Sequence, residues 1–218
     1  MRLCIKLSIF LLSCLAPLFP LNAQDISMVF SHADVNHGLS DNWVKCIYRD
    51  SRGFLWFGTS SGLNRFDGYN FEVFRHRASD STSIADNAIN VITEDREGNL
   101  WVGTRSGISV LDGGTFVFSA VNLVPSMPMA CQDIAYITAM ARGASGDLLI
   151  GTHNGFFLFN HSTKSFRHIM PDEQSCSSEI NNITAIAPGN DGTWWIGTNN
   201  CFIFRFSPNS NSIEKFEC

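Results

Sequence analysis

Aspartates recur in this sequence at positions where paired carboxylates could do chemistry. Two carboxylates that flank a cleft can hydrolyse a glycosidic bond, one as the acid and the other as base or nucleophile. The four candidates stand in register at glycine-containing turns and are Asp50, Asp67, Asp95 and Asp112. Aspartate is favoured in turns because its carboxylate accepts hydrogen bonds from nearby backbone N–H groups. We therefore interpret all four as turn residues and predict no catalytic residue in this chain.

The pattern of histidines and cysteines does not indicate metal or nucleophile chemistry. His32 and His37 lie close to Asp34, but their spacing fits no metal-ligand set, so we interpret them as part of a solvated loop. No CxxC or Cys/His spacing is typical of zinc. The sequence has neither a Gly-x-Ser-x-Gly nucleophile elbow nor a phosphate-binding loop. We predict no metal site and no cofactor.

Five cysteines follow the first 23 residues, namely Cys46, Cys131, Cys176, Cys201 and Cys218. An odd number leaves at least one free thiol, even where export favours disulfides. Cys131 and Cys176 lie in equivalent loops, so a disulfide between them is one alternative. Cys46 stands at a strand position that other repeats fill with valine or alanine, and we expect it to be a small buried apolar residue.

A five-residue pattern that ends in Gly-Thr recurs along the chain and indicates the elements that position these side chains. Its copies are Leu55 to Thr59, Leu100 to Thr104, Leu148 to Thr152 and Trp194 to Thr198. Their glycines are 45, 48 and 46 residues apart. A period of this length is typical of propeller blades, which bury their apolar faces by stacking on one another.

Each repeat predicts four hairpin-linked strands. We expect inner strands at 44–47, 89–92, 137–140 and 183–186 and second strands at the Gly-Thr patterns. Third strands are expected at 63–66, 108–111, 156–159 and 202–206, and outer strands at 71–74, 116–118, 165–168 and 212–216. The prediction is an all-β chain whose residues 24–218 form four four-stranded antiparallel blades of a partial β-propeller. The repeats would span about 39–78, 84–122, 131–170 and 178–218.

The large rings and glycines of the pattern are predicted to be structural. Alternation in the second strand places Trp56, Trp101 and Trp195 on one face, with Leu149 in the third repeat. We expect these rings to fill the gap between neighbouring sheets, which stabilises each by about 2–3 kcal/mol or more. The structural glycines that accompany them are Gly58, Gly103, Gly151 and Gly197.

Residues 1–23 have the form of a secretory signal peptide. Arg2 and Lys6 precede the apolar stretch from Leu7 to Phe19, and Ala23 supplies a small residue at the expected cleavage site. A lipoprotein site at Cys14 and an uncleaved anchor are the alternatives, although the apolar run is short for a membrane span. Without Arg2 and Lys6 the 15 basic side chains fall to 13 against 20 acidic ones, a net charge of −7. We therefore expect an exported protein that does not bind nucleic acid.

In a propeller, the loops before the inner strands and those between second and third strands share one face. That face would carry aromatic rings able to stack on sugars, and polar groups able to bond hydroxyls or acids. The candidate ligand-binding residues are Trp43, Arg105, Tyr136, His153, Asn154, Asn199 and Asn200. Asparagine is also a common turn former, so a purely structural role for these asparagines is the alternative.

The chain resembles the two-component regulator propeller repeats of periplasmic sensors in hybrid histidine kinases of the Bacteroides type. The resemblance rests on Gly38 to Asn42, Gly53 to Tyr69 and Glu94 to Thr104. It extends from residue 26 to residue 218, with Leu149 and Cys201 as departures in the third and fourth repeats. The family implies paired propellers, a β-sandwich, a membrane helix and kinase and receiver domains in a longer parent.

The resemblance implies a ligand-sensing fragment that detects oligosaccharides and works with further blades, membrane-linked kinase domains and a second copy of the parent. The parent would be a histidine kinase anchored in the inner membrane, whereas this chain would itself not be an enzyme. Four blades would leave the propeller incomplete, and we expect marginal stability and self-association. The alternatives are a streptogramin-lyase-like propeller enzyme and a scaffold for protein contacts.

Overall fold

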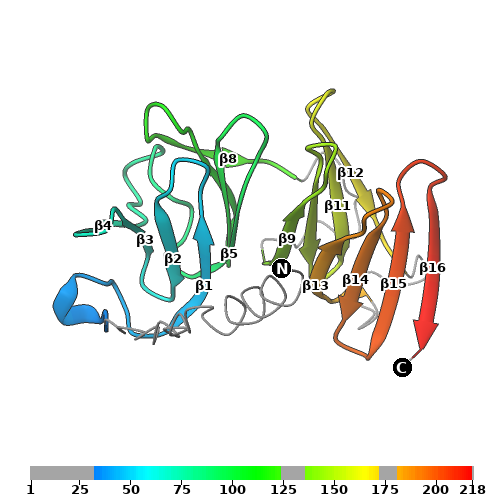
Figure 1. Cartoon of the computed structure of the whole chain (residues 1–218), viewed down its shortest axis with the longest axis horizontal. Helices are drawn as coiled ribbons and strands as arrows, with labels where there is room; N and C mark the ends of the chain where they lie inside the picture. The colour runs from blue at the N-terminus through cyan, green and yellow to red at the C-terminus, as the bar shows by residue number, and fades with distance from the viewer. Residues whose placement is uncertain (1–31, 124–135, 172–180, 218) are drawn as a thin grey trace, which may run out of the picture. The chain divides into compact units, whose positions relative to one another are not determined.

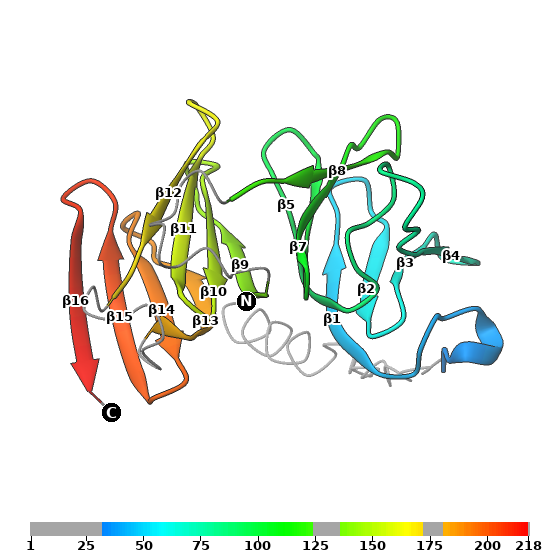
Figure 2. The ribbon, with the colours of Figure 1, turned by 180° about the vertical axis from the view of Figure 1, so that it is seen from behind.

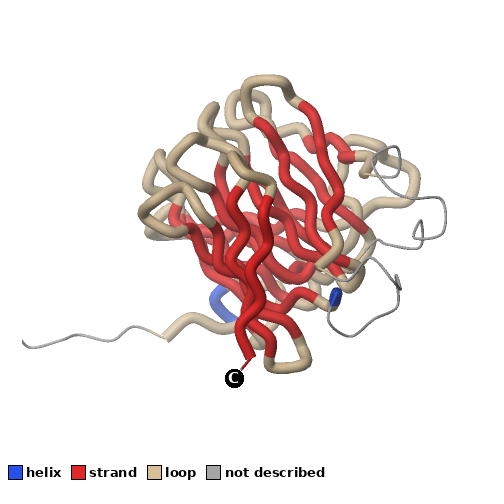
Figure 3. The backbone as a smooth tube through the Cα atoms, turned by 90° about the vertical axis from the view of Figure 1, so that its right-hand side faces the viewer, coloured by secondary structure: helices blue, strands red, loops and turns tan. Residues whose placement is uncertain are grey.

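The computed structural model describes residues 32–123, 136–171 and 181–217, and β-strands run through most of them (Figure 3). A 3-10 helix, η1 (Val35–His37), precedes the first strand. No helix in these ranges combines the length and the hydropathy that crossing a membrane requires. The predicted signal peptide, Cys131 and Cys176 lie outside the described residues, as do the expected starts of the third and fourth repeats.

The strands form four antiparallel sheets of four strands each, in chain order within every sheet (Figures 1 and 2). The first sheet comprises β1 (Val44–Arg49), β2 (Leu55–Thr59), β3 (Leu63–Phe66) and β4 (Phe71–Phe74). The second comprises β5 (Ile89–Glu94), β6 (Leu100–Thr104), β7 (Gly107–Leu111) and β8 (Phe118–Val121). The third comprises β9 (Ile137–Arg142), β10 (Leu148–Thr152), β11 (Gly155–Asn160) and β12 (Ser165–Ile169). The fourth comprises β13 (Ile183–Pro188), β14 (Trp194–Thr198), β15 (Phe202–Ser207) and β16 (Ser212–Glu217).

The predicted fold class is confirmed, with one strand displaced. We expected the outer strand of the second sheet at 116–118, but β8 begins at Phe118. Phe116 instead has a left-handed backbone with φ 58° and donates its N–H to the Asp112 carbonyl at 3.0 Å. The hairpin turn therefore extends through the first apolar residue, and the pairing of β7 with β8 starts two residues later.

Three apolar clusters form the core, and each lies between two neighbouring sheets. Trp56 and Leu63 of the first sheet pack with Ile89 and Phe118 of the second. The second cluster joins the second sheet to the third, and the third joins the third sheet to the fourth. The inner strands β1, β5, β9 and β13 are also in contact in that order. All sixteen described strands belong to one compact unit, Ala33–Cys218, as expected for blades that stack on their neighbours.

The glycine of each Gly-Thr pair permits this close stacking. A Cβ atom on Gly103 would lie 2.6 Å from Ile137 Cγ2, on the inner strand of the next sheet. Gly58 and Gly151 face the next inner strand in the same way, with a hypothetical Cβ 2.7 Å and 2.6 Å from the nearest isoleucine atoms. In the fourth sheet the nearest atom to a Cβ on Gly197 is 3.6 Å away, on Ala185 of the same sheet. Residues of the same sheet also limit the space, since a Cβ on Gly58 would collide with Cys46 Sγ and one on Gly103 would lie 2.6 Å from Val91 Cγ1. In the first three sheets the glycine thus makes room for the following sheet, and in the first two it also makes room for its own inner strand.

The threonine of the pair closes the hairpin that follows. Thr104 Oγ1 donates a hydrogen bond to the Gly107 carbonyl at 2.8 Å and accepts one from the Ser106 N–H at 3.1 Å. Thr59 and Thr152 make the same two contacts in their own hairpins. Cys201 replaces the turn glycine in the fourth sheet and adopts φ 59°, while Thr198 donates to the Phe202 carbonyl at 3.3 Å.

The prediction that the repeated aspartates cap turns is confirmed, and two of them also hold a tryptophan. Asp95 accepts hydrogen bonds from the backbone N–H groups of Glu97 and Asn99 at 2.8 and 2.9 Å, and from Trp101 Nε1 at 3.0 Å. Burial alone would raise the pKa of Asp95, but the hydrogen bonds outweigh it and lower that pKa below 3.8. Asp50 binds Trp56 Nε1 at 2.9 Å in the same arrangement.

The third sheet has lost both members of this aspartate–tryptophan pair. Gly143 stands where the first and second repeats carry aspartate, and Leu149 stands at the tryptophan position. A Cβ on Gly143 would lie 2.8 Å from Trp194 Cζ2. The buried Trp194 of the next sheet therefore uses the space that a larger side chain at position 143 would fill. Glycine at position 143 in the third sheet thus makes room for the large ring of Trp194 in the fourth sheet.

The outer face of the fourth sheet departs from our expectation. Trp195 was expected to fill a gap between sheets, but it is substantially exposed, and so are Ile203 and Phe216 beside it. Register places Ile203 opposite Gly197 and Phe216, the arrangement that Leu63 has with Gly58 and Phe74 in the first sheet. The ring at the tryptophan position is buried only where another sheet follows.

Cys46 is half-buried and packs against the first core cluster, close to its expected environment. Burial raises the pKa of its thiol to about 11, so the sulfur is protonated and unreactive at neutral pH. Cys201 is an exposed free thiol in the turn described above.

Candidate functional site

A β-bulge recurs at the second residue of every inner strand. In the first sheet Val44 pairs with Thr59 and Cys46 pairs with Gly58, which leaves Lys45 as an extra residue. The same two-against-one pairing occurs in the other three sheets. The extra residues are Lys45, Asn90, Thr138 and Thr184, which we call the bulge residues. A bulge redirects a side chain out of the regular alternation of a strand, and bulges are common beside functional sites.

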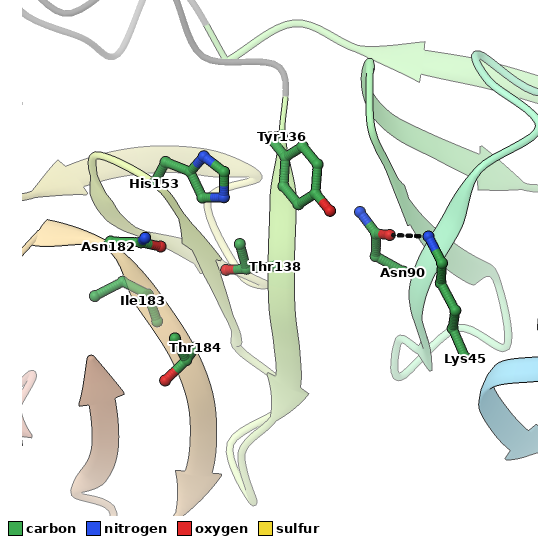
Figure 4. A pocket seen from close by; sticks show the side chains of 8 residues that line it. All are labelled: Lys45, Asn90, Tyr136, Thr138, His153, Asn182, Ile183 and Thr184. Atoms are coloured by element: carbon green, nitrogen blue, oxygen red, sulfur yellow. Dashed lines mark hydrogen bonds between the residues drawn. The ribbon is translucent and has the colours of Figure 1, made fainter. Parts of the chain in front are cut away.

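All four bulge residues line one pocket of about 340 Å³ (Figure 4). This volume lies within the range of about 300–1,000 Å³ that is usual for small-molecule sites. The pocket is completed by Tyr136, His153, Asn182 and Ile183. These residues come from all four sheets, so the pocket exists because the inner strands lie side by side.

A hydrogen-bonded chain crosses the sheets at this pocket. Lys45 Nζ donates to Asn90 Oδ1 at 3.2 Å, and Asn90 Nδ2 donates to the Ile137 carbonyl at 2.9 Å. The amide of Asn90 is therefore held in a defined orientation between β1 and β9. Because the lysine ammonium has three N–H donors, two remain for a bound molecule.

Thr138 brings a hydroxyl whose hydrogen-bonding capacity is unused. Its Oγ1 atom is buried and has no hydrogen-bond partner among the described residues. A buried hydroxyl without a partner costs free energy, and a ligand hydroxyl or a water molecule would satisfy it. Figure 4 shows this side chain between Tyr136 and Thr184, on the pocket lining.

Two rings form an aromatic wall at the pocket. Tyr136 precedes β9 and His153 lies in the turn between β10 and β11. Their centroids are 4.4 Å apart and their planes differ by 19°, so the rings are stacked. The stacked pair offers a rigid apolar surface beside polar bulge residues, the combination that binds the faces and hydroxyls of sugars.

Of the seven sequence-predicted ligand residues, the structure places two in this pocket, Tyr136 and His153. Trp43 is 73% exposed and does not line the pocket. The other four also lie outside its lining and belong to the turns between second and third strands, namely Arg105, Asn154, Asn199 and Asn200. Their binding role stays a prediction.

Sequence reasoning missed Lys45, Asn90, Thr138, Asn182 and Thr184 as pocket residues. A signal was present, because the second residue of each inner strand is polar while its neighbours on both sides are apolar. The alternation predicts an inner strand and does not by itself indicate a bulge. The bulge becomes visible only from the pairing register. The described part of the chain contains no group of three or more His, Cys, Asp or Glu side chains that could hold a metal ion.

Stacked four-stranded blades with a pocket at their inner strands define a propeller-type fold. The family model of the two component regulator propeller matches residues 38–61, 83–106 and 177–200. These segments are the first, second and fourth repeats, and the third repeat, with Leu149, is unmatched. Three segments of this chain thus match the two component regulator propeller, and the resemblance predicted from sequence is confirmed.

One relative is a much longer histidine kinase. Residues of this chain are 44% identical over 77 positions to histidine kinase P4 of Formosa agariphila, a match that covers 35% of this chain and 6% of that protein. The chain therefore spans a small part of this relative.

Solved structures share the fold. The extracellular domain of a hybrid two-component system from B. thetaiotaomicron is 21% identical, with 88% of this chain and 26% of that chain covered and a TM-score of 0.68. A second such domain from the same organism is 24% identical, with 84% and 31% covered and a TM-score of 0.56. Virginiamycin B lyase from Staphylococcus aureus is 17% identical, with 89% and 61% covered and a TM-score of 0.64. These likenesses concern the fold alone.

Proposed function

We propose that this chain is the ligand-binding part of an extracytoplasmic sensor in a hybrid two-component system and that its pocket binds an oligosaccharide. The repeats and the P4 relative support the sensor assignment. The observation that carries the ligand proposal is the convergence of four bulged side chains on one pocket beside the Tyr136–His153 wall. Amide, hydroxyl and ammonium groups together match the donors and acceptors of sugar hydroxyls.

In this proposal the protein is periplasmic and the kinase domains belong to a longer, membrane-anchored parent. The ligand would contact inner strands from several sheets at once. A ligand that binds one arrangement of these sheets more tightly than another shifts their equilibrium, and a linked dimeric kinase can respond to that shift. The chain itself binds and does not transfer phosphate.

A thermal-shift screen of neutral and acidic oligosaccharides against the chain tests the proposal. We expect at least one class of sugar to raise the melting temperature, with a rise that grows with the logarithm of its concentration above Kd. The variant Tyr136→Ala should weaken binding about three- to tenfold, because it removes the ring that stacks on the sugar. Absence of a shift with every sugar would count against the ligand proposal.

The matched control is Trp43→Ala, which removes another aromatic side chain that lies outside the pocket lining. Binding should be unchanged in this variant. Loss of binding in Trp43→Ala with retention in Tyr136→Ala would place the ligand on the loops rather than in the pocket.

A further inference from the structure

Resting on the proposed function, we infer that the pocket selects a sugar with an acidic group and that Lys45 is the residue that recognises it. The lining contains one lysine and no aspartate or glutamate. Lys45 lies at the bulge of β1 and reaches the pocket from the first sheet (Figure 4). The positive charge of Lys45 therefore comes from a bulge position, and the bulge places its side chain at the pocket.

The chain as a whole is acidic, with a net charge of −5. Lys45 forms no ion pair with any of the described residues, and its one side-chain hydrogen bond there goes to the neutral Asn90 amide. By contrast, Lys164 lies 2.5 Å from Glu97 and Arg65 lies 2.6 Å from Glu72. The Lys45 ammonium is thus held by a neutral group and its charge is left for a ligand.

The groups around Lys45 specify the rest of the ligand. The side chains of Asn90 and Thr138 can form hydrogen bonds with hydroxyl groups of a ligand. The Thr138 oxygen has no hydrogen-bond partner among the described residues. The Tyr136–His153 wall favours a flat ring face. A carboxylate or sulfate on a hydroxylated ring would pair with Lys45 through a charge-assisted hydrogen bond, the strong kind. The ligand class is therefore an anionic carbohydrate, either a uronate or a sulfated sugar.

Calorimetric titration of the chain with digalacturonate, galactobiose and galactose 6-sulfate tests this inference. The two disaccharides are matched in size and differ in charge, and the sulfated sugar distinguishes sulfate from carboxylate as the acidic group. We expect one of the anionic probes to bind at least about tenfold more tightly than galactobiose, with affinity that falls as salt is added.

The variant Lys45→Gln should remove this preference, and Lys45→Arg should retain most of it. Lys164→Gln is the matched control, because it removes the same charge at an exposed turn outside the pocket. Equal affinity for galactobiose and the anionic probes in the original chain, unchanged by Lys45→Gln, would overturn the charge inference and leave sugar binding intact. Failure of every probe and of the wider sugar screen would overturn both proposals.

Discussion

The second and fourth sheets carry the same repeat, yet they use it differently. Trp101 is 5% exposed and Ile108 is 1% exposed, whereas their counterparts Trp195 and Ile203 are 41% and 38% exposed. The second sheet packs against a following sheet through these residues, and no described residue covers the fourth in that way. The repeated tryptophan and glycine are therefore contacts between blades, and one blade on its own gives them no partner.

The burial of a residue in the inner strand depends in the same way on whether another sheet precedes its own. Ile92 of the second inner strand is 6% exposed because it packs against the first sheet, and Ile47 at the same register of β1 is 62% exposed. Interior positions and end positions of an otherwise regular repeat thus differ in energetic value, although their sequences look alike.

The largest expected effect is the loss of an interior tryptophan. Trp101→Ala should destabilise the chain by about 3–5 kcal/mol, because it leaves a large cavity between the second and third sheets. Trp195→Ala should cost less than about 1 kcal/mol, since that ring is already partly in solvent. Urea unfolding followed by far-UV circular dichroism measures both. Similar losses in the two variants would contradict the proposed contrast.

A smaller effect is expected from adding a methyl group to the repeated glycine. Gly103→Ala forces a Cβ against Ile137 of the next sheet and against Val91 of its own sheet, and it should cost about 1–3 kcal/mol through overpacking. Gly197→Ala meets only an ordinary contact at 3.6 Å and should be nearly neutral. The midpoint of urea denaturation for each variant measures the difference. A strongly destabilised Gly197→Ala variant would show that the glycine serves its own hairpin instead.

The smallest effect concerns the aspartate that only the first two sheets pair with tryptophan. Asp95→Asn should cost about 1 kcal/mol at neutral pH, because charge-assisted hydrogen bonds become neutral ones. The folded-state pKa of Asp95 lies below the ordinary 3.8, so its contribution is complete above that pH and is lost as the pH falls through the lowered value. Stability measured from pH 6 down to pH 2 should therefore decline less in Asp95→Asn than in the parent chain.

Much of the architecture could be predicted because spacing and turn chemistry are local. The Gly-Thr period, the alternating strands and the turn glycines indicate sixteen strands in four sheets, and the structure has them. The start of β8 and the exposure of Trp195 could not be predicted this way. The first depends on how far a turn extends, and the second depends on whether another sheet follows.

The pocket was less accessible to sequence reasoning for a geometric reason. Aromatic and turn residues draw attention to loops, and two of them, Tyr136 and His153, do line the pocket. Lys45 and Asn90 enter the site because a strand gains one residue against its partner. That register is a property of paired strands, which a single strand's pattern does not reveal.

The bulge has a further consequence for how such repeats diversify. Each repeat contributes one side chain to the cavity from a position that the β-ladder leaves unpaired, while separate positions hold the blades together. Exchanging Lys45, Asn90, Thr138 or Thr184 would alter the recognised molecule with little penalty to folding. If the pocket binds as proposed, its specificity can change one repeat at a time while the contacts between sheets stay the same.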